Sequence, residues 1–583
     1  MPAAGTAGRR GSPRAAFLAI LLLAAALRLP GLETVPPPLN QDEASRGYDA
    51  WSLWTTGRDR HGQAWPLFLE SFGPGDFTAA LSTYCTIPFV AVLGPTPLAM
   101  RLPAAVLGLA TVAWVFLWLR REIGDLAALT AAGALACDPW HVALTRTAHE
   151  SAFAPALLAA ALWAAARGGL LPRWKGSTSP NPRTPPSAGW SIAAGLLLGL
   201  HAWVYPATRL FTPIFCGAAA AFFGGHWRML LKEASGRRRF LALVFGLSLG
   251  LAPLLVTAAT HPERLAARAA ATLVTHRTDG SLAAATAVAR NWVANLNPLY
   301  WFYECDEMSG ATIPRVGLHL PVLAPLFVLG LWQVLASCRA RSWSRLLLAW
   351  LLLFPVPAAI CGDWNPHPLR SVGGMLLFPV FCGLGATWIA ERWPRPGRRS
   401  VLTAAILAGV NLAHFARTYY FEFPFLCRPG YQNALYEAAA FLAREHPEAE
   451  QILVTNYSNQ PYIYALLLER IPPAALQAEP PVIVGGRLGF HQVLKAGRYL
   501  FVPRDDVDGA VSRFQALLAD RAVDGRGPTL LLDLERPDLV IEAEPLARFA
   551  VGDPRVPGQV LVVYRLANRP SSSGPAPPPA VRP

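Results

Sequence analysis

The feature that most constrains this chain is a series of long apolar runs separated by short basic segments. A membrane-spanning helix needs about 20 mainly apolar residues. Charged residues make up 15% of the chain, against about 25% in an average soluble domain. We therefore predict a mainly α-helical, polytopic membrane protein. The eleven expected spans are 16–32, 102–119, 123–139, 148–166, 189–204, 208–224, 241–259, 317–337, 346–361, 371–390 and 401–418.

A twelfth apolar run, residues 79–94, is short and contains Thr83, Thr86 and Pro88. If it does not span, the loops on the amino-terminal side hold 21 Lys and Arg in 77 residues, and the opposite loops hold 12 in 150. That distribution follows the positive-inside rule and places the amino terminus in the cytoplasm. We expect 79–94 to be an in-plane or re-entrant helix within a first external loop, 33–101. The alternative is a true span in a twelve-span protein.

Beyond residue 418 the hydropathy changes, and helix-period and strand-like segments alternate. We predict a transmembrane module over 1–418, an external soluble α/β domain over 419–568 and a disordered tail over 569–583. The formal net charge is +14. Because the arginines lie in short clusters between apolar runs, this charge indicates a membrane protein and no nucleic-acid partner.

Unusual polar residues lie at the external ends of the predicted spans, whereas the cytoplasmic loops carry little beyond Arg and Lys. A one-sided collection of acids, histidines and single arginines indicates a catalytic or binding face at the external surface. These residues are Asp42, Glu43, Asp49, Asp138, His141, Arg146, His149, Glu150, Tyr205, Arg209, Asp363, His367 and Arg370.

The first of these groups follows the first span. Asp42 and Asp49 are seven residues apart and share a face of a helix, and Arg46 lies four residues after Asp42. One interpretation is a solvated juxtamembrane helix with an i,i+4 ion pair. The other is that a carboxylate facing an apolar groove serves as a general base.

The arginines also allow two interpretations. Arg370 follows the sequence NPHP and begins a span, so it is either an interfacial side chain or a ligand for a lipid phosphate. Arg146 and Arg209 have the same ambiguity, and Tyr205 lies beside Arg209. Taken individually, His149 and His367 fit a structural or interfacial role better than a ligand role.

Several ordered segments resemble glycosyltransferase family 39, which includes protein O-mannosyltransferases and lipid A aminoarabinose transferases. They are NQDEASRGYDAW after the first span, AMRLPAAVLGLATVAWVFLWLRREIG, DPWHVALTRTAHESAFAPALLAAALW, GLLLGLHAWVYPATRLFTPIF and NPHPLRSVGGMLLFPVF. No single segment is specific, but their order runs through residues 16–418.

The resemblance implies the glycosyltransferase C fold and a reaction. A sugar moves from a polyprenyl-phosphate donor to an acceptor hydroxyl of a protein, lipid or glycan at the extracytoplasmic face. Asp42 is expected to be the base and Glu43 its neighbour, orienting the acceptor. Arg370 and His367 are expected to hold the lipid phosphate. From their positions at the external span ends, and not from the resemblance, Arg146, Arg209, Asp49 and Tyr205 are expected to be further substrate-binding residues. The resemblance suggests a bacterial inner-membrane protein.

Two other functions are open. A transporter or flippase of lipid-linked sugars would place charges near mid-span and show a repeat between halves, and neither is evident. A membrane scaffold with a partner-binding external domain would need no acidic pair. No cofactor is predicted, since the chain contains no nucleotide-binding loop and no convincing metal-ligand set. A divalent cation stays open because some relatives use one.

Overall fold

The computed structural model describes residues 12–74, 76–174, 185–305, 312–393, 397–455, 460–485, 491–502, 529–535 and 543–566. The sequence predicts a Pro/Ser-rich linker without chemistry over 173–189 and a disordered tail over 569–583. Residues 175–184 and 567–583 lie outside the described part of the chain.

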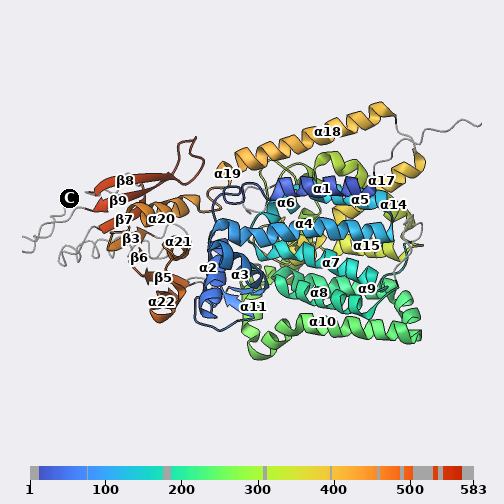
Figure 1. Cartoon of the computed structure of the whole chain (residues 1–583), viewed down its shortest axis with the longest axis horizontal. Coiled ribbons are helices and arrows are strands. Elements are labelled where there is room, and N and C mark those ends of the chain that lie inside the picture. Colours follow the sequence, from blue (N-terminus) through green and yellow to red (C-terminus); the bar gives the residue numbers. More distant parts are fainter. Residues whose placement is uncertain are drawn as a thin grey trace, which may run out of the picture.

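The apolar runs form a bundle of helices that lie side by side (Figure 1). Within the described residues, six helical segments are long and apolar enough to cross a membrane, and several shorter apolar helices pack among them. Each of the eleven predicted spans overlaps a helix of the bundle, so the chain is a multi-pass membrane protein. These helices are α1 (Pro13–Arg28), α4 (Pro97–Glu122), α5 (Asp125–Cys137), α7 (Ala154–Arg167), α8 (Ala188–Val204), α9 (Pro206–Lys232), α10 (Ala234–Thr260), α14 (Ala324–Ser337), α15 (Ser342–Leu353), α17 (Leu377–Arg392) and α18 (Arg398–Arg417).

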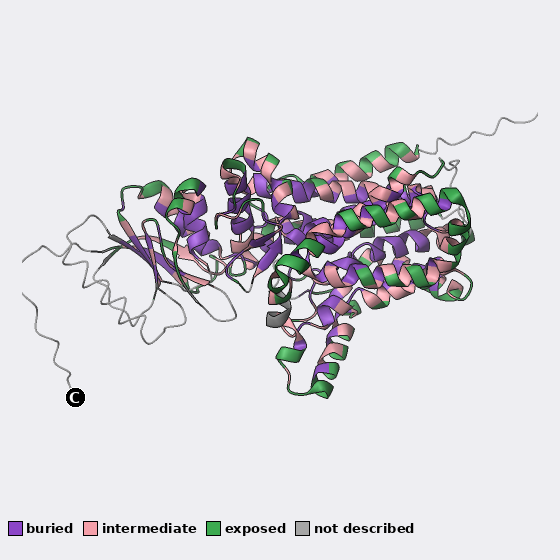
Figure 2. Cartoon of the chain, turned by 90° about the horizontal axis from the view of Figure 1, so that it is seen from below, coloured by how far each residue is buried: buried purple, intermediate pink, exposed green. Residues whose placement is uncertain are grey.

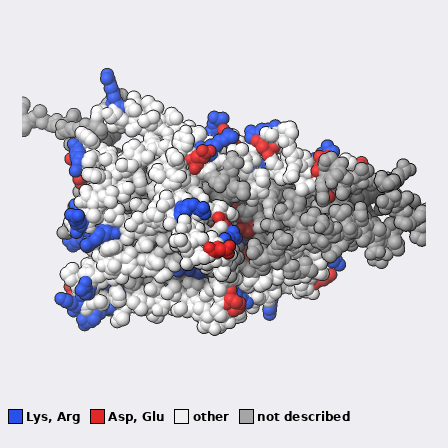
Figure 3. All heavy atoms as spheres, turned by 180° about the vertical axis from the view of Figure 1, so that it is seen from behind, with Lys and Arg blue, Asp and Glu red and all other residues white. Residues whose placement is uncertain are grey.

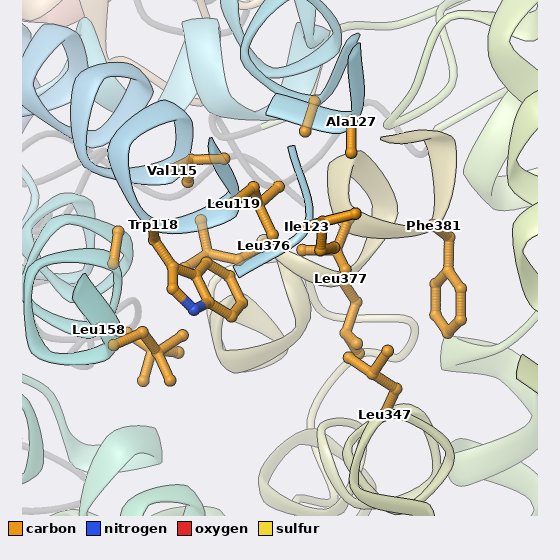
Figure 4. Packing of buried hydrophobic residues seen from close by; sticks show 14 of the residues in the cluster. Val115, Trp118, Leu119, Ile123, Ala127, Leu158, Leu347, Leu376, Leu377 and Phe381 are labelled. Atoms are coloured by element: carbon orange, nitrogen blue, oxygen red, sulfur yellow. The ribbon is translucent and has the colours of Figure 1, made fainter. Parts of the chain in front are cut away.

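The bundle core is built from aliphatic and aromatic side chains of α4, α5, α7, α15 and α17. Trp118, Leu119 and Leu377 are at most 2% exposed and meet there (Figure 4). Elsewhere the backbones of α8 and α10 approach closely, because Gly199 faces Gly250 and a Cβ atom at either position would clash. Small residues at such crossings are typical of membrane helices.

The outer helices expose apolar side chains. Figure 2 shows exposed and half-buried residues along the outside of the bundle. On α10, Leu241 is 67% exposed, and on α18, Val410 is 59% exposed. An apolar surface of this kind suits contact with lipid tails.

Basic residues gather at the end of the bundle remote from the C-terminal domain (Figure 3). They lie in the last turn of α4, between α9 and α10, at the start of α15 and at the end of α17, in the loops that the sequence predicts to be cytoplasmic. The connections at the opposite end contain short elements: α2 (Gln41–Thr56), β1 (Phe68–Glu70), β2 (Phe77–Ala79), α3 (Leu81–Leu93), α6 (Pro139–Thr145), the 3₁₀ turn η1 (Glu150–Phe153), α11 (Pro262–Thr272), α12 (Ser281–Asn295), α13 (Pro298–Phe302), α16 (Val356–Ala359) and α19 (Phe423–Leu426).

Helix α3 covers most of the ambiguous run 79–94. Its 13 residues are as many as those of α5, so helix length does not separate it from the bundle helices, whereas its packing does. Val90 of α3 packs in one cluster with Ala50 of α2 and Ala99 of α4. The helix therefore lies against α2 at the end of the bundle that faces the C-terminal domain (Figure 1), which supports the non-spanning interpretation.

The C-terminal part is an α/β domain with a seven-stranded mixed sheet in the order β4-β5-β6-β3-β7-β9-β8. The central strand β3 is parallel to β6 and β7, and the outer pairs are antiparallel. The strands are β3 (Gln451–Thr455), β4 (Val482–Gly485), β5 (His491–Ala496), β6 (Tyr499–Val502), β7 (Thr529–Leu534), β8 (Ala543–Ala550) and β9 (Val560–Leu566), with helices α20 (Asn433–Glu445), α21 (Tyr462–Leu468) and α22 (Pro473–Ala478).

Residues between α18 and α20 pack on the bundle rather than on this sheet. Tyr419, Phe423 and Tyr431 share a core cluster with Leu27 of α1 and Val142 of α6. The sheet core begins at Ala434. The compact α/β unit thus starts near α20, somewhat after the change in hydropathy at 419.

The α/β domain docks on α2. Tyr48 belongs to the same buried cluster as the residues of α20 and α21, and its hydroxyl donates to the carbonyl of Ile471 at 2.7 Å. The Gln477 amide donates to Ser52 Oγ, Thr56 Oγ1 and the Asp59 carbonyl at 3.1, 3.0 and 2.9 Å. The helix that carries the acidic motif is therefore held between the bundle and the C-terminal domain.

Candidate active site

The first turn of α2 is fixed by a capping box. The Asn40 side chain accepts from the Glu43 N–H at 2.9 Å, and the Glu43 carboxylate accepts from the Asn40 N–H at 3.2 Å. Glu43 also accepts two hydrogen bonds from Arg101 of α4, at 2.9 and 2.8 Å, and one from the Ala148 N–H at 2.8 Å. Three chain segments therefore meet at one carboxylate.

Glu43 is enclosed by these contacts, and its expected role in orienting the acceptor stays a prediction. The residue is 0% exposed and both carboxylate oxygens are engaged. Burial alone would raise the pKa of Glu43, but Arg101 and the backbone N–H donors hold that pKa below its ordinary value. The Glu43 carboxylate thus holds three chain segments together.

Asp42 is adjacent in sequence but differs in environment. It lies in the first turn of α2, is only partly buried, and forms no hydrogen bond or ion pair with any residue that the structure describes. The i,i+4 pair with Arg46 is not formed. Arg46 instead lies 2.6 Å from Glu150 Oε2 and donates to the Ala148 carbonyl at 3.0 Å. The Asp42 carboxylate is thus available to accept a proton.

Asp49 does not join Asp42, although the two share the helix. It is 1% exposed and forms an ion pair of 3.1 Å with Arg60. The Arg60 N–H also donates to it at 3.1 Å. Burial raises the pKa of Asp49 to about 7, despite Arg60. The side chain therefore joins α2 to the loop that follows it, and the substrate contact expected from the sequence stays a prediction.

Arg146 is also a structural residue. Its side chain is 0% exposed, and Nε and both Nη groups donate to the carbonyls of Leu27, Arg28, Pro30 and Val35. Because these bonds use all of its N–H groups, none is left for a lipid phosphate. The predicted phosphate contact is replaced by a clamp on the chain that leaves α1.

A second group of candidate site residues lies where α8 ends and α9 begins. Tyr205 breaks the helix with extended backbone angles, φ −147° and ψ 143°, and its ring meets the His149 ring edge-on at 5.6 Å. Arg209 follows in the first turn of α9, with its guanidinium carbon 4.9 Å from the centre of the Phe68 ring. Among the described residues, Arg209 Nε and Nη2 are buried and have no hydrogen-bond acceptor.

A buried guanidinium without an acceptor is costly, because its lost hydration is not replaced. Glu150 acts on Arg209 electrostatically but does not satisfy these atoms. The donors of Arg209 are therefore suited to an anion that binds from outside the chain. Phosphate and carboxylate are the anions whose oxygens match a guanidinium.

Arg370 lies in the loop that precedes α17, near Tyr205. Both of its Nη atoms donate to the Asp363 carboxylate, one of them at 2.5 Å. His367 is 3% exposed and stacks on Trp364 with 4.9 Å between ring centroids. Its Nδ1 accepts from the Arg370 N–H at 3.4 Å, so His367 supports the loop.

The structure places Asp42, Tyr205, Arg209 and Arg370 at one end of the bundle, and it buries Glu43, Asp49 and Arg146. The sequence identified His149, Glu150 and Asp363 as unusual polar residues but did not give them partners. Their contacts, with Tyr205, Arg46 and Arg370, join segments far apart in the chain. Within the described ranges, no three His, Cys, Asp or Glu side chains are grouped as a metal site would require.

Comparison with known proteins agrees with this architecture. The model of the dolichyl-phosphate-mannose-protein mannosyltransferase family matches residues 80–177, which contain α3 to α7. The resemblance seen in the sequence is thereby confirmed for this segment. No curated protein is similar enough to the chain to give a match.

Solved structures confirm the predicted glycosyltransferase C fold with a C-terminal α/β domain. ArnT from Cupriavidus metallidurans in the apo state aligns with a TM-score of 0.51 at 14% identity, over 97% of this chain and 99% of that protein. The same ArnT bound to undecaprenyl phosphate aligns with a TM-score of 0.51 at 13% identity, over 97% and 98%. An oligosaccharyltransferase from Archaeoglobus fulgidus gives a TM-score of 0.44 at 13% identity, over 79% of this chain and 64% of its own length.

Proposed function

We propose that this protein is a membrane glycosyltransferase that moves a sugar from a polyprenyl-phosphate donor to an acceptor hydroxyl at the extracytoplasmic face. One observation carries the proposal: a carboxylate without a partner among the described residues, Asp42, and a buried guanidinium with open donors, Arg209, lie at the same end of the bundle. His149 connects the two, because Asp42 acts on it electrostatically and its ring contacts Tyr205, four residues before Arg209. A general base and an anion site are the two requirements of this reaction.

The proposed chemistry assigns a step to each group. Asp42 accepts the proton of the acceptor hydroxyl as its oxygen forms a bond to the anomeric carbon. The bond between that carbon and the phosphate oxygen breaks, and its electron pair stays on the phosphate. Arg209 and Arg370 stabilise the charge that develops there. Tyr205 lies beside His149 and near Arg370, four residues before Arg209.

Two further observations support a lipid-borne donor. The ArnT structure that shares this fold was solved with undecaprenyl phosphate, and the site lies at the end of apolar helices whose outer surfaces suit lipid contact. The basic loops at the far end of the bundle support an external position for the site. The acceptor class, whether protein, lipid or glycan, and the sugar are left to experiment.

The test is a transfer assay with purified protein in lipid nanodiscs. Polyprenyl-phosphate hexoses and pentoses are supplied one at a time with extracts of the cell envelope, and release of polyprenyl phosphate is followed. The proposal predicts release with at least one donor, coupled to a glycosylated acceptor. Movement of an intact donor across a liposome membrane without release would instead indicate a flippase.

A further inference from the structure

The two arginines near Tyr205 are in different states. Arg209 has buried donors that no described residue accepts. Arg370 is already paired, and its two Nη atoms face the two oxygens of Asp363. The side chains of Arg370 and Asp363 are 11% and 16% exposed, so the pair lies beneath the surface but is not sealed from it.

The backbone around this pair is held in place by other contacts. Asn295 of α12 accepts from the His367 N–H at 3.0 Å and from the Ser371 hydroxyl at 2.8 Å. The Asn365 side chain donates to the Cys361 carbonyl at 3.1 Å. Because the loop is anchored independently, Arg370 and Asp363 can exchange partners through side-chain rotation alone.

We propose that Asp363 is a latch that competes with the donor phosphate for Arg370. This inference rests on the proposed function. A polyprenyl-phosphate sugar is a phosphodiester with one negative charge. The Asp363 carboxylate carries the same charge. In the ground state the carboxylate is the better partner, because it meets both Nη atoms in bidentate geometry and needs no immobilised ligand.

The balance changes as the sugar leaves. Cleavage of the bond between the anomeric carbon and the phosphate oxygen leaves a monoester, which carries about −1.5 to −2 at pH 7. The larger charge draws Arg370 from Asp363 to the phosphate. An interaction that forms mainly in the transition state lowers the barrier without tightening the bound substrate. Asp363 then recaptures Arg370 and repels the anionic product, which promotes its release.

The test compares Asp363→Asn with the wild type in affinity for undecaprenyl phosphate, measured on the full chain in nanodiscs. Asparagine keeps the size of the side chain but removes the competing charge. We expect the dissociation constant to fall at least about fivefold, because an arginine that is already free binds phosphate without first losing a partner. In turnover, the donor KM and kcat should both fall as product release slows.

Matched variants distinguish a gain in affinity caused by freeing Arg370 from one caused by a general loss of stability. Glu437→Gln, in α20 of the C-terminal domain, removes a second bidentate partner, that of Arg428, and should leave undecaprenyl phosphate affinity unchanged. In Asp363→Asn/Arg370→Gln the gain should vanish relative to Arg370→Gln alone. If Asp363→Asn does not fold, Asp363→Ser is used in the same comparison.

Each result decides between the alternatives. Unchanged or weaker affinity in a folded Asp363 variant overturns the latch, while transfer by the wild type leaves the proposed function intact. A gain that persists without Arg370 also overturns it. If the wild type neither binds undecaprenyl phosphate nor transfers a sugar, the proposed function fails and the latch fails with it.

Discussion

At the scale of single residues, neighbouring acids have unlike roles because α2 turns them in different directions. Glu43 is enclosed by Arg101 and two backbone N–H groups, whereas Asp42 has no partner among the described residues. Since removing one partner of a buried ion pair leaves an uncompensated charge, the two residues should respond to substitution in different ways.

Glu43→Gln should lower stability by about 3–5 kcal/mol at pH 7, because the buried Arg101 loses its counter-charge. The sign of the pH dependence follows from the lowered pKa of Glu43. A carboxylate of this kind stabilises the folded state above its ordinary pKa of 4.5, and the contribution is lost as pH falls through the folded value.

Thermal unfolding in detergent between pH 7 and pH 3 measures this effect. The wild type should lose stability as the pH drops below about 4.5, and Glu43→Gln should lose less over the same interval. Glu535→Gln, which removes an exposed partner of Arg548, is the control and should shift stability by less than about 1 kcal/mol. Equal pH dependence in wild type and Glu43→Gln would show that Glu43 is not the group responsible.

Replacing Arg209 should make the protein more stable but weaken its binding of the lipid phosphate. Arg209→Met removes an unsatisfied buried charge and keeps much of the side-chain volume, so the melting temperature should rise by a few degrees. The dissociation constant for undecaprenyl phosphate should increase about tenfold to a hundredfold, as expected for losing hydrogen bonds to a charged group.

The melting temperature and the dissociation constant for undecaprenyl phosphate are measured on the same preparations, with Arg146→Met as the comparison variant. Arg146 donates to carbonyls through every N–H group, so its loss should destabilise the protein strongly. A destabilised Arg209→Met with unchanged lipid affinity would assign Arg209 a structural role like that of Arg146.

At the scale of elements, the sequence was most informative where a single physical rule dominates. Apolar length predicts the bundle helices, and the distribution of arginines predicts a non-spanning role for 79–94. The side-chain partners are not predictable in this way. Arg101 with Glu43, Arg46 with Glu150 and Asp49 with Arg60 pair across loops whose paths depend on tertiary packing. Helical spacing suggested a common role for Asp42 and Asp49, but the fold of residues 57–60 enclosed Asp49 instead.

The position of α3 can be tested through the loop that follows α4. If α3 lies flat, a reporter fused after Arg121 is cytoplasmic, because only α1 and α4 cross the membrane before it. We expect cytoplasmic activity at Arg121 and external activity at Gly94. The reverse at Arg121 would require α3 to span, and the assignment of the acidic motif to the external face would need revision.

At the scale of the whole molecule, two different parts of the protein hold α2. The C-terminal domain holds its carboxyl-terminal half, and α4 holds its first turn. The amide of one residue of α22, Gln477, donates hydrogen bonds to Ser52, Thr56 and the Asp59 carbonyl. The α/β domain was predicted from hydropathy and strand patterns, but its contact with α2 was not, because Gln477 lies in a polar segment without a distinctive signature.

Gln477→Ala should loosen the carboxyl-terminal half of α2 without releasing its first turn, which Glu43 and Arg101 hold. Hydrogen exchange should rise in residues 50–56 and stay unchanged in 41–46, with a loss of stability of about 1–2 kcal/mol. Gln451→Ala, a substitution at the start of β3 away from α2, is the control. Uniform exchange along α2 would contradict separate anchoring of its two ends.

If Asp42 is the base of a sugar transfer, its replacement should reduce turnover without weakening donor binding. Transfer from a polyprenyl-phosphate donor is measured with Asp42→Asn and Asp49→Asn, and donor binding is measured separately. We predict that Asp42→Asn binds the donor normally and loses at least about a hundredfold in turnover, whereas Asp49→Asn loses far less. Near-normal turnover by a folded Asp42→Asn protein would contradict the account and remove Asp42 from the mechanism.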